Sequence, residues 1–125
     1  MNLSPNMTNK WRIPAQVVSE ISSKFENCAY CRKKMIYPYS ARKHCDSATV
    51  EHLNEVGPFY WDEGLRKEDL VMCCGSCNSS RGKKSLLDWF ETQYCVARGI
   101  GVRTVAREVK DYIFRTFANR QQLNP

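Results

Sequence analysis

The sequence contains no apolar segment long enough to cross a membrane, and its first residues lack the features of a secretory signal. A membrane-spanning helix needs about 20 consecutive, mostly apolar residues, and no such run occurs. Residues 1–10 are polar and have no apolar centre. We therefore expect a cytoplasmic protein without a membrane partner, in a compartment that keeps thiols reduced.

Internal repeats and low-complexity segments are also absent, which excludes a repeat array as the architecture. The 125 residues suffice for one domain with short extensions. A domain of this size buries a small core and often needs an additional staple, such as a metal ion.

Acidic residues are outnumbered by basic ones, with 13 Asp and Glu against 19 Lys and Arg, and the formal net charge is +6. This balance favours a polyanionic partner such as nucleic acid. Because many soluble proteins are mildly basic, the charge alone does not establish that partner.

Cysteine, in contrast, is abundant: the chain has seven. The odd number excludes a fully paired disulfide framework. Cys28 and Cys31 form one C-x-x-C pair, and Cys74 and Cys77 form a second. Each pair can bind one ion in a tight turn, and four thiolates complete a tetrahedron, so we predict a structural zinc site with these four ligands.

Two other interpretations of the cysteines remain open at this stage. The first is a redox C-x-x-C motif, which would be expected within a βαβ pattern that this sequence does not show. The second is that the spacing of the cysteines is a coincidence. Cys73 adjoins Cys74 and could compete with it as a ligand, although only Cys74 has the two-residue spacing to Cys77. Cys45 and Cys95 are expected to be ordinary thiols.

A polar arm over residues 1–12 precedes a predicted helix over residues 14–25. Pro14 suits the first helical turn, where its missing N–H costs nothing. Apolar residues follow at helical spacing: Val17, Val18, Ile21 and Phe25. Residues 47–53 favour a short strand, and Gly57-Pro58 opens a loop that extends to about Lys67.

A short apolar run, Leu70 to Met72, leads into the second cysteine pair, and one or two helical turns should follow Cys77 and end near Gly82. Ser85 to Asp88 fits a capping box that opens another helix. Its predicted buried stripe consists of Leu86, Leu87, Phe90 and Tyr94.

A final helix is predicted from apolar residues at helical spacing, namely Val102, Val105, Ala106, Val109, Ile113 and Phe117. Its other face carries Arg103, Arg107, Lys110 and Arg120. That basic face is either solvated or lies along phosphates.

Several motifs occur in a recognisable order: the first cysteine pair, then Val50-Glu51-His52-Leu53, then Asp69-Leu70-Val71, then the second pair followed by Asn78-Ser79-Ser80-Arg81-Gly82. Over residues 28–90 this order resembles the HNH endonuclease family. The resemblance implies an α+β fold with a ββα-metal, treble-clef-like core, in which two antiparallel strands and a helix surround a divalent cation. The expected organisation is an arm and helix over 1–27, the nuclease core over 28–90 and a helical extension over 91–125.

By this resemblance, His52 is the general base, and Glu51 and Asn78 hold a catalytic Mg²⁺ or Mn²⁺. The assignment is chemically sensible, because imidazole titrates near neutrality and Mg²⁺ prefers oxygen ligands. Asp69 stands where the family usually has Asn and would position the loop of the base. Since neighbouring strand residues face opposite sides, a strand end or bulge is expected at Glu51 and His52.

Double-stranded DNA is the expected partner, and eight basic residues are predicted to contact it: Arg81, Lys83, Lys84, Arg32, Lys33, Lys34, Arg42 and Lys43. Arg81 lies one helical turn after Asn78 and could hold a phosphate beside the metal. A homodimer or a larger complex is compatible with the sequence, as are phage, mobile-element, restriction and defence roles.

Each site residue also has an ordinary structural interpretation. His52 could be a core histidine, Glu51 a surface charge and Asn78 a helix cap. Two functions therefore compete with the endonuclease: a non-catalytic zinc module that binds nucleic acid, and a zinc protein that docks onto a larger nuclease assembly.

Overall fold

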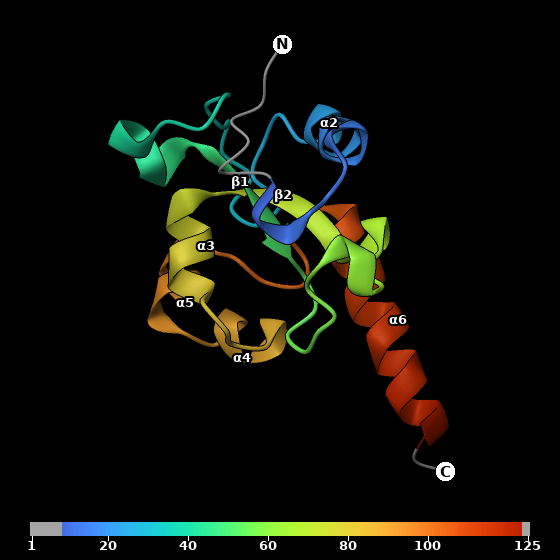
Figure 1. The fold of residues 1–125 in the computed structure, drawn as a ribbon. Coiled ribbons are helices and arrows are strands. Elements are labelled where there is room, and N and C mark those ends of the chain that lie inside the picture. Colours follow the sequence, from blue (N-terminus) through green and yellow to red (C-terminus); the bar gives the residue numbers. More distant parts are fainter. Residues whose placement is uncertain (1–8, 124–125) are drawn as a thin grey trace.

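Two short strands lie at the centre of the computed structural model, which describes residues 9–123 (Figure 1). β1 (Ala48–His52) pairs with β2 (Leu70–Cys74) in an antiparallel sheet, with Ala48 opposite Cys74 and His52 opposite Leu70. All of β2 is buried. The fold class is α+β, as predicted from the sequence.

Two helices flank this sheet. α2 (Ala15–Lys24) packs against β2 through Val18 and Ile21, in agreement with the helical spacing of its apolar residues. α3 (Gly75–Arg81) follows β2 directly. The Cys74 side chain caps α3 by accepting the N–H of Cys77, and the helix ends at Gly82, whose positive φ of 54° suits glycine. The predicted stop near Gly82 is confirmed.

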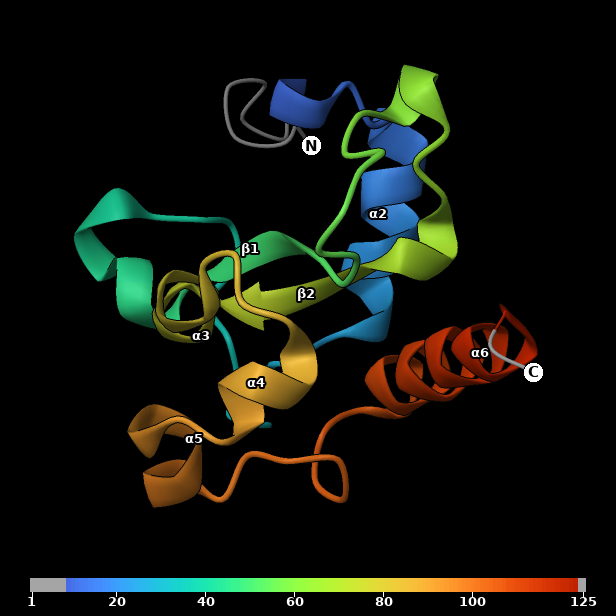
Figure 2. The ribbon, with the colours of Figure 1, turned by 90° about the horizontal axis from the view of Figure 1, so that it is seen from below.

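Three helices complete the chain: α4 (Leu86–Phe90), α5 (Gln93–Arg98) and α6 (Arg107–Leu123). Ser85 caps α4 by accepting the N–H of Asp88, as predicted. Thr92 caps α5 in the same way, so one predicted helix is in fact two short ones. α6 extends away from the sheet (Figure 2).

Four short 3-10 helices connect these elements: η1 (Asn9–Trp11), η2 (Ala41–Asp46), η3 (Trp61–Glu63) and η4 (Lys67–Asp69). η3 lies inside the segment that was predicted as a loop. Within residues 9–123, no helix combines the length and the apolar character that crossing a membrane requires.

The core includes buried residues from Ile13 to Val109, and its largest fully buried side chains are Trp89 and Tyr30. Their rings pack edge to face, with 4.8 Å between the ring centroids. Two predicted stripes are partly wrong. In α4 the buried residues are Leu86 and Trp89, whereas Leu87 is exposed, because the helix ends at Phe90 and turns a different face inward.

The final helix also begins later than predicted. Residues 101–105 form a turn, and the buried Val105 and Ala106 precede α6. Val102 and Phe117 are exposed, so they contribute no core contact. Arg103 and Arg107 are exposed, as expected of a basic face. Residues 1–8 of the predicted arm over 1–12 and the side chain of Arg120 lie outside the described residues.

Candidate functional site

Four cysteines lie together at the junction of the first C-x-x-C turn, β2 and α3. The Sγ atoms of Cys28, Cys31, Cys74 and Cys77 all lie within 4.8 Å of one another, and Cys31 Sγ is 3.9 Å from Cys74 Sγ. Zn–S bonds of about 2.3 Å in a tetrahedron separate neighbouring sulfurs by roughly 3.8 Å. The cluster could therefore hold a metal ion such as zinc.

The protein also stabilises a thiolate at this cluster. The backbone N–H groups of Tyr30, Cys31 and Cys74 all donate to Cys28 Sγ. Hydrogen bonds from Cys31 and the other two thiols, together with the Cys74 N–H, hold the pKa of Cys28 far below its ordinary value. Metal binding needs deprotonated sulfur, so this environment suits a metal ligand.

The remaining cysteines lie apart from the cluster. Cys73 is buried, and its side chain contacts Thr49, because successive strand residues face opposite sides. Burial raises the pKa of Cys73 well above its ordinary value, as expected of a thiol that packs like an apolar side chain. Cys45 is exposed and Cys95 is buried.

His52 is the last residue of β1, and its ring is held in one orientation. Nε2 lies 2.9 Å from the backbone oxygen of Phe59, and since that oxygen can only accept, Nε2 carries the proton. Nδ1 is then the ring nitrogen with the lone pair. The Trp11 and Phe59 rings pack edge-on against the imidazole, with distances of 4.6 and 5.6 Å between ring centroids. Burial lowers the pKa of His52, which favours the neutral ring.

Asn78 projects from α3 toward β1. Its Nδ2 donates to Thr49 Oγ1 at 2.9 Å and to the Val50 carbonyl at 3.4 Å. Thr49 Oγ1 in turn donates to the Cys73 carbonyl, so it accepts from the amide of Asn78. These bonds orient the amide, and Oδ1 is the atom that can serve as a ligand.

Glu51 lies on the face of β1 opposite to His52 and takes part in a buried network. Its Oε2 accepts from the Tyr30 hydroxyl at 2.6 Å and from Arg81 Nη1 at 2.9 Å. Burial raises the pKa of Glu51, an effect that the Arg81 guanidinium partly offsets. Both bonds fall on Oε2, so Oε1 is the oxygen that a cation could use.

The strand does end at His52, as predicted, but pairing continues regularly through Glu51 and His52 without a bulge. Glu51 and His52 nevertheless line one cavity of about 840 Å³, which Asn78 also lines. The structure therefore brings the three predicted residues to the same space, although from different sides.

Arg81 is placed differently from its predicted role. Its side chain is only 3% exposed, and besides Glu51 and Tyr30 it donates to the backbone oxygens of His52, Leu53 and Lys84. A guanidinium with five protein acceptors ties the end of α3 to the end of β1. A phosphate contact would require it to leave these partners.

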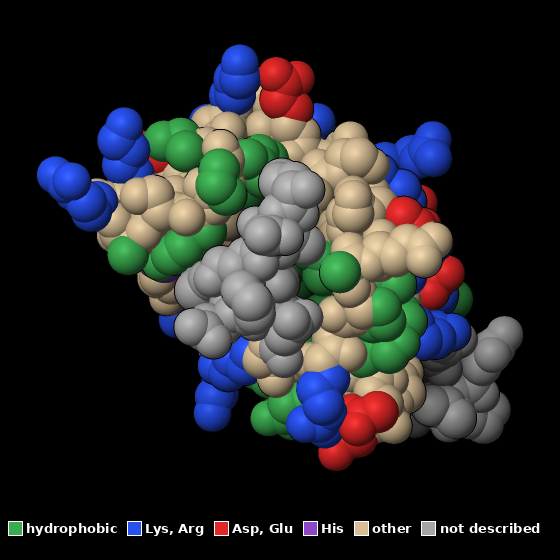
Figure 3. Space-filling view, turned by 45° about the horizontal axis from the view of Figure 1, so that its top comes forward, with side chains coloured by type: hydrophobic (Ala, Val, Ile, Leu, Met, Phe, Trp, Pro, Cys, Tyr) green, Lys and Arg blue, Asp and Glu red, His purple; other side chains and the backbone are tan. Residues whose placement is uncertain are grey.

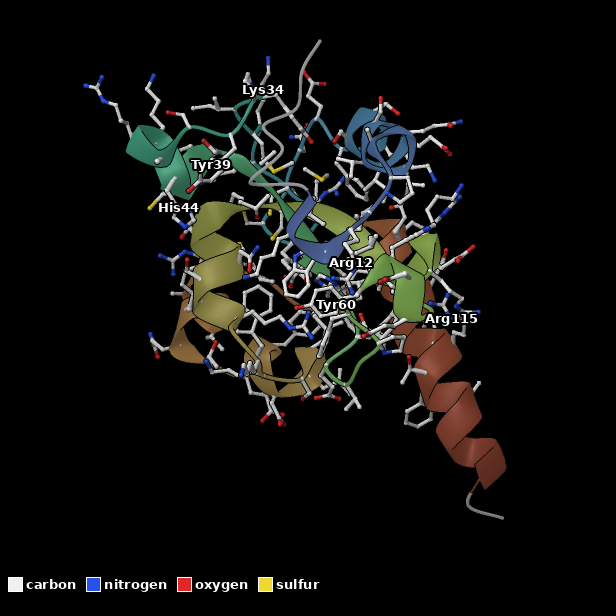
Figure 4. All side chains as sticks on the ribbon, in the orientation of Figure 1. Arg12, Lys34, Tyr39, His44, Tyr60 and Arg115 are labelled. Carbon is white, nitrogen blue, oxygen red and sulfur yellow. The ribbon has the colours of Figure 1, made fainter. Side chains whose placement is uncertain are left out.

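Asp69 lies outside the cavity and holds the far end of the hairpin. Its backbone oxygen accepts the N–H of Leu53 at 2.7 Å, directly after His52. Its carboxylate lies 4.0 Å from Arg66 and 3.7 Å from Arg115, which reaches across from α6 (Figure 4). The predicted role of Asp69 in positioning the loop of the base stays a prediction.

The other predicted DNA contacts are exposed basic side chains: Arg32, Lys33, Lys34, Arg42, Lys43, Lys83 and Lys84. Lys33 pairs with Asp46 at 2.8 Å and Lys34 with Glu26 at 3.5 Å, both in solvent. Figure 3 shows hydrophobic side chains on one face of the molecule, with Lys and Arg projecting at much of its margin.

Three residues of the site were not found from the sequence: Tyr30, Trp11 and Phe59. Tyr30 is the second of the two residues between Cys28 and Cys31, and only the folded chain shows that its hydroxyl reaches Glu51. Trp11 comes from η1 and Phe59 from the loop after β1, and no spacing links either to His52.

Comparisons with protein-family models, with curated proteins and with solved structures found no match to this chain.

Proposed function

We propose that the protein is a metal-dependent endonuclease of the HNH type that hydrolyses DNA phosphodiester bonds, and that its four-cysteine cluster binds a structural zinc ion. The single observation that carries the proposal is the hydrogen bond from His52 Nε2 to the Phe59 oxygen. It directs the basic nitrogen, Nδ1, away from the protein acceptor, and the lowered pKa keeps that nitrogen unprotonated near neutral pH.

The order of elements supports the same proposal. Two antiparallel strands, β1 and β2, are followed at once by α3. This is the arrangement that the resemblance to HNH endonucleases implies, with the base on the first strand and an oxygen ligand on the helix. The cysteine cluster joins β2 and α3, so a zinc ion there would stabilise the hairpin without taking part in the reaction.

The donor set for a catalytic cation consists of Glu51 Oε1 and Asn78 Oδ1. Two protein oxygens suit Mg²⁺, which keeps several waters and takes further oxygens from phosphate. When bound, such a cation would stabilise the charge that develops on the phosphate. Glu51 attracts a cation less strongly than a free carboxylate would, because Arg81 already neutralises its charge. Much of the attraction for the cation must therefore come from the DNA phosphates.

The chain's own residues would act as follows. His52 Nδ1 accepts a proton from water, whose oxygen forms a bond to phosphorus. The bond from phosphorus to one sugar oxygen breaks, and that oxygen takes a proton from solvent. Phe59 holds the imidazole tautomer, and Asp69 holds the segment after His52 through the N–H of Leu53.

One observation favours the second candidate, a non-catalytic zinc module that binds nucleic acid. Glu51, Tyr30 and Arg81 form a complete buried network, and such networks also occur for purely structural reasons. A binding module would need the exposed lysines and arginines but not the base His52.

A nicking assay separates the two functions. Supercoiled plasmid is incubated with the zinc-loaded protein and Mg²⁺ or Mn²⁺, alongside His52→Ala. Nicking by the wild type and its loss in the variant are expected. If the wild type cuts nothing in any divalent cation, the enzyme proposal is wrong; equal nicking by both proteins would identify a contaminating nuclease.

A further inference from the structure

The cavity beside β1 is lined by more than the proposed reaction needs. Four aromatic side chains border it: Trp11, Tyr37, Tyr39 and Phe59. Its volume of about 840 Å³ falls in the range of sites that enclose a small molecule, roughly 300–1,000 Å³. Trp11 and Phe59 pack against His52, but the proposed hydrolysis leaves the rings of Tyr37 and Tyr39 without a role.

Hydrogen bonds fix two of these rings, Tyr37 and Tyr39. The Tyr37 hydroxyl donates to the Phe25 carbonyl at 2.6 Å, and the Tyr39 hydroxyl lies 2.9 Å from His44 Nδ1. Tyr39 and His44 lie side by side next to α3 (Figure 4). Tyr37 is nevertheless 41% exposed, and Tyr39 is partly exposed. Rings that are oriented but still open are suited to stack on a planar ligand.

Positive charge accompanies the rings. Lys10 lies over the Trp11 ring at 4.8 Å from its centroid, and Lys83 lines the cavity just beyond the end of α3. Aromatic rings together with cations are the combination by which proteins bind single-stranded nucleic acid, the rings holding bases and the cations holding phosphates.

We propose that this cavity binds unpaired nucleotides of single-stranded DNA, with bases stacked on Tyr37 and Tyr39 and a phosphate presented to His52; this names the substrate class of the proposed nuclease and rests on that function. An intact duplex offers only base edges and backbone, because the base faces are already stacked on one another. A duplex would leave the rings of this cavity unused.

Fluorescence anisotropy with a labelled, short oligothymidylate tests the proposal. The protein is zinc-loaded His52→Ala, without added divalent cation, so that no strand is cut. Two further probes are an abasic oligomer with the same number of phosphates and a duplex that contains the same thymidylate strand. The single strand should bind at least about 5-fold more tightly than the abasic oligomer, because each stacked base contributes about 1–3 kcal/mol.

Variants test whether Tyr37 and Tyr39 are responsible for binding the oligothymidylate. The double change Tyr37→Leu and Tyr39→Leu should reduce binding of the oligothymidylate to the level of the abasic oligomer. Tyr39→Phe keeps the ring and should keep the binding. Phe114→Leu removes an exposed ring on α6, away from the cavity, and should change nothing.

Equal binding of the abasic oligomer and the oligothymidylate would overturn the proposal, as would tighter binding of the duplex. If either result accompanied plasmid nicking by the wild type, the nuclease proposal would stand without this one. If the single strand bound as expected but no divalent cation supported cleavage, the binding site would stand and the nuclease proposal would fail.

Discussion

The Arg81 guanidinium and the Glu51 carboxylate form a buried ion pair between α3 and β1, with Nη1 2.9 Å from Oε2. The Tyr30 hydroxyl completes the pair by donating to the same oxygen. Because Arg81 also holds the His52 and Leu53 carbonyls, the pair fixes the strand end that carries the proposed base. The pair therefore affects both the stability of the fold and the placement of the proposed base.

Arg81→Ala should lower the free energy of unfolding by about 3–5 kcal/mol, because it leaves a buried carboxylate without its partner. The double change Glu51→Leu and Arg81→Met should recover part of that loss, since no unpaired charge remains. Urea denaturation of the zinc-loaded proteins measures both. Asp62→Ala breaks the exposed pair with Arg12 and should change stability by at most about 1 kcal/mol. A similarly small loss in Arg81→Ala would mean that the pair is not buried in solution.

Local patterns in the sequence were sufficient to predict α2, β1 and the caps at Ser85 and Gly82, whereas the second strand was expected only from the resemblance to HNH endonucleases. These features depend on spacing and on single residues, which a sequence displays directly. The stripe of α4 was assigned to Leu87 and not to Trp89 because the helix was expected to continue past Phe90. Thr92 caps a new helix there, and the change of face depends on packing against Tyr30.

In the candidate site, too, some features could be predicted from the sequence and others could not. The cysteine cluster was predictable, because the two-residue spacing constrains each pair locally. The partner of Arg81 was not, because a phosphate and a buried Glu51 are equally reasonable partners for an arginine one turn after Asn78. Only the regular pairing of β1 with β2 places the Glu51 side chain on the side of α3.

His52→Ala should reduce plasmid nicking by about 10²- to 10⁴-fold, the usual contribution of a general base. Zinc content and the circular dichroism spectrum should remain those of the wild type, because His52 is only partly buried and its ring donates one hydrogen bond. Added imidazole should restore part of the activity by entering the space that the side chain vacates. An unfolded variant would assign a structural role to His52 instead.

The fall of kcat/KM at low pH should report the protonation of His52. Burial lowers the pKa of His52 below 6.5, so the neutral, basic form persists as the pH falls until that lowered pKa is reached. We expect kcat/KM at saturating Mg²⁺ to decline only below pH 6.5. A decline centred clearly above 6.5 would show that another group, or a protonated His52, governs the reaction.

Asn78→Ala should weaken binding of the catalytic cation, seen as a higher Mg²⁺ concentration for half-maximal nicking, because one of two protein oxygens is lost. Asn78→Asp keeps an oxygen at that position and should require less Mg²⁺ than Asn78→Ala. Titration of each variant with Mg²⁺ measures this order. Identical titrations for both variants would remove Asn78 from the ligand set.

Cys74→Ser should lose the bound metal and the folded state together, because a structural zinc ion contributes on the order of 10 kcal/mol in small domains. Cys73→Ser is the matched control. Cys73 adjoins Cys74 but faces Thr49 and lies outside the cluster, so this variant should retain one zinc ion per chain. Metal content by atomic emission and unfolding followed by circular dichroism test the pair. Zinc retained in folded Cys74→Ser, or lost from Cys73→Ser, would mean that the ligand set differs from the four clustered cysteines.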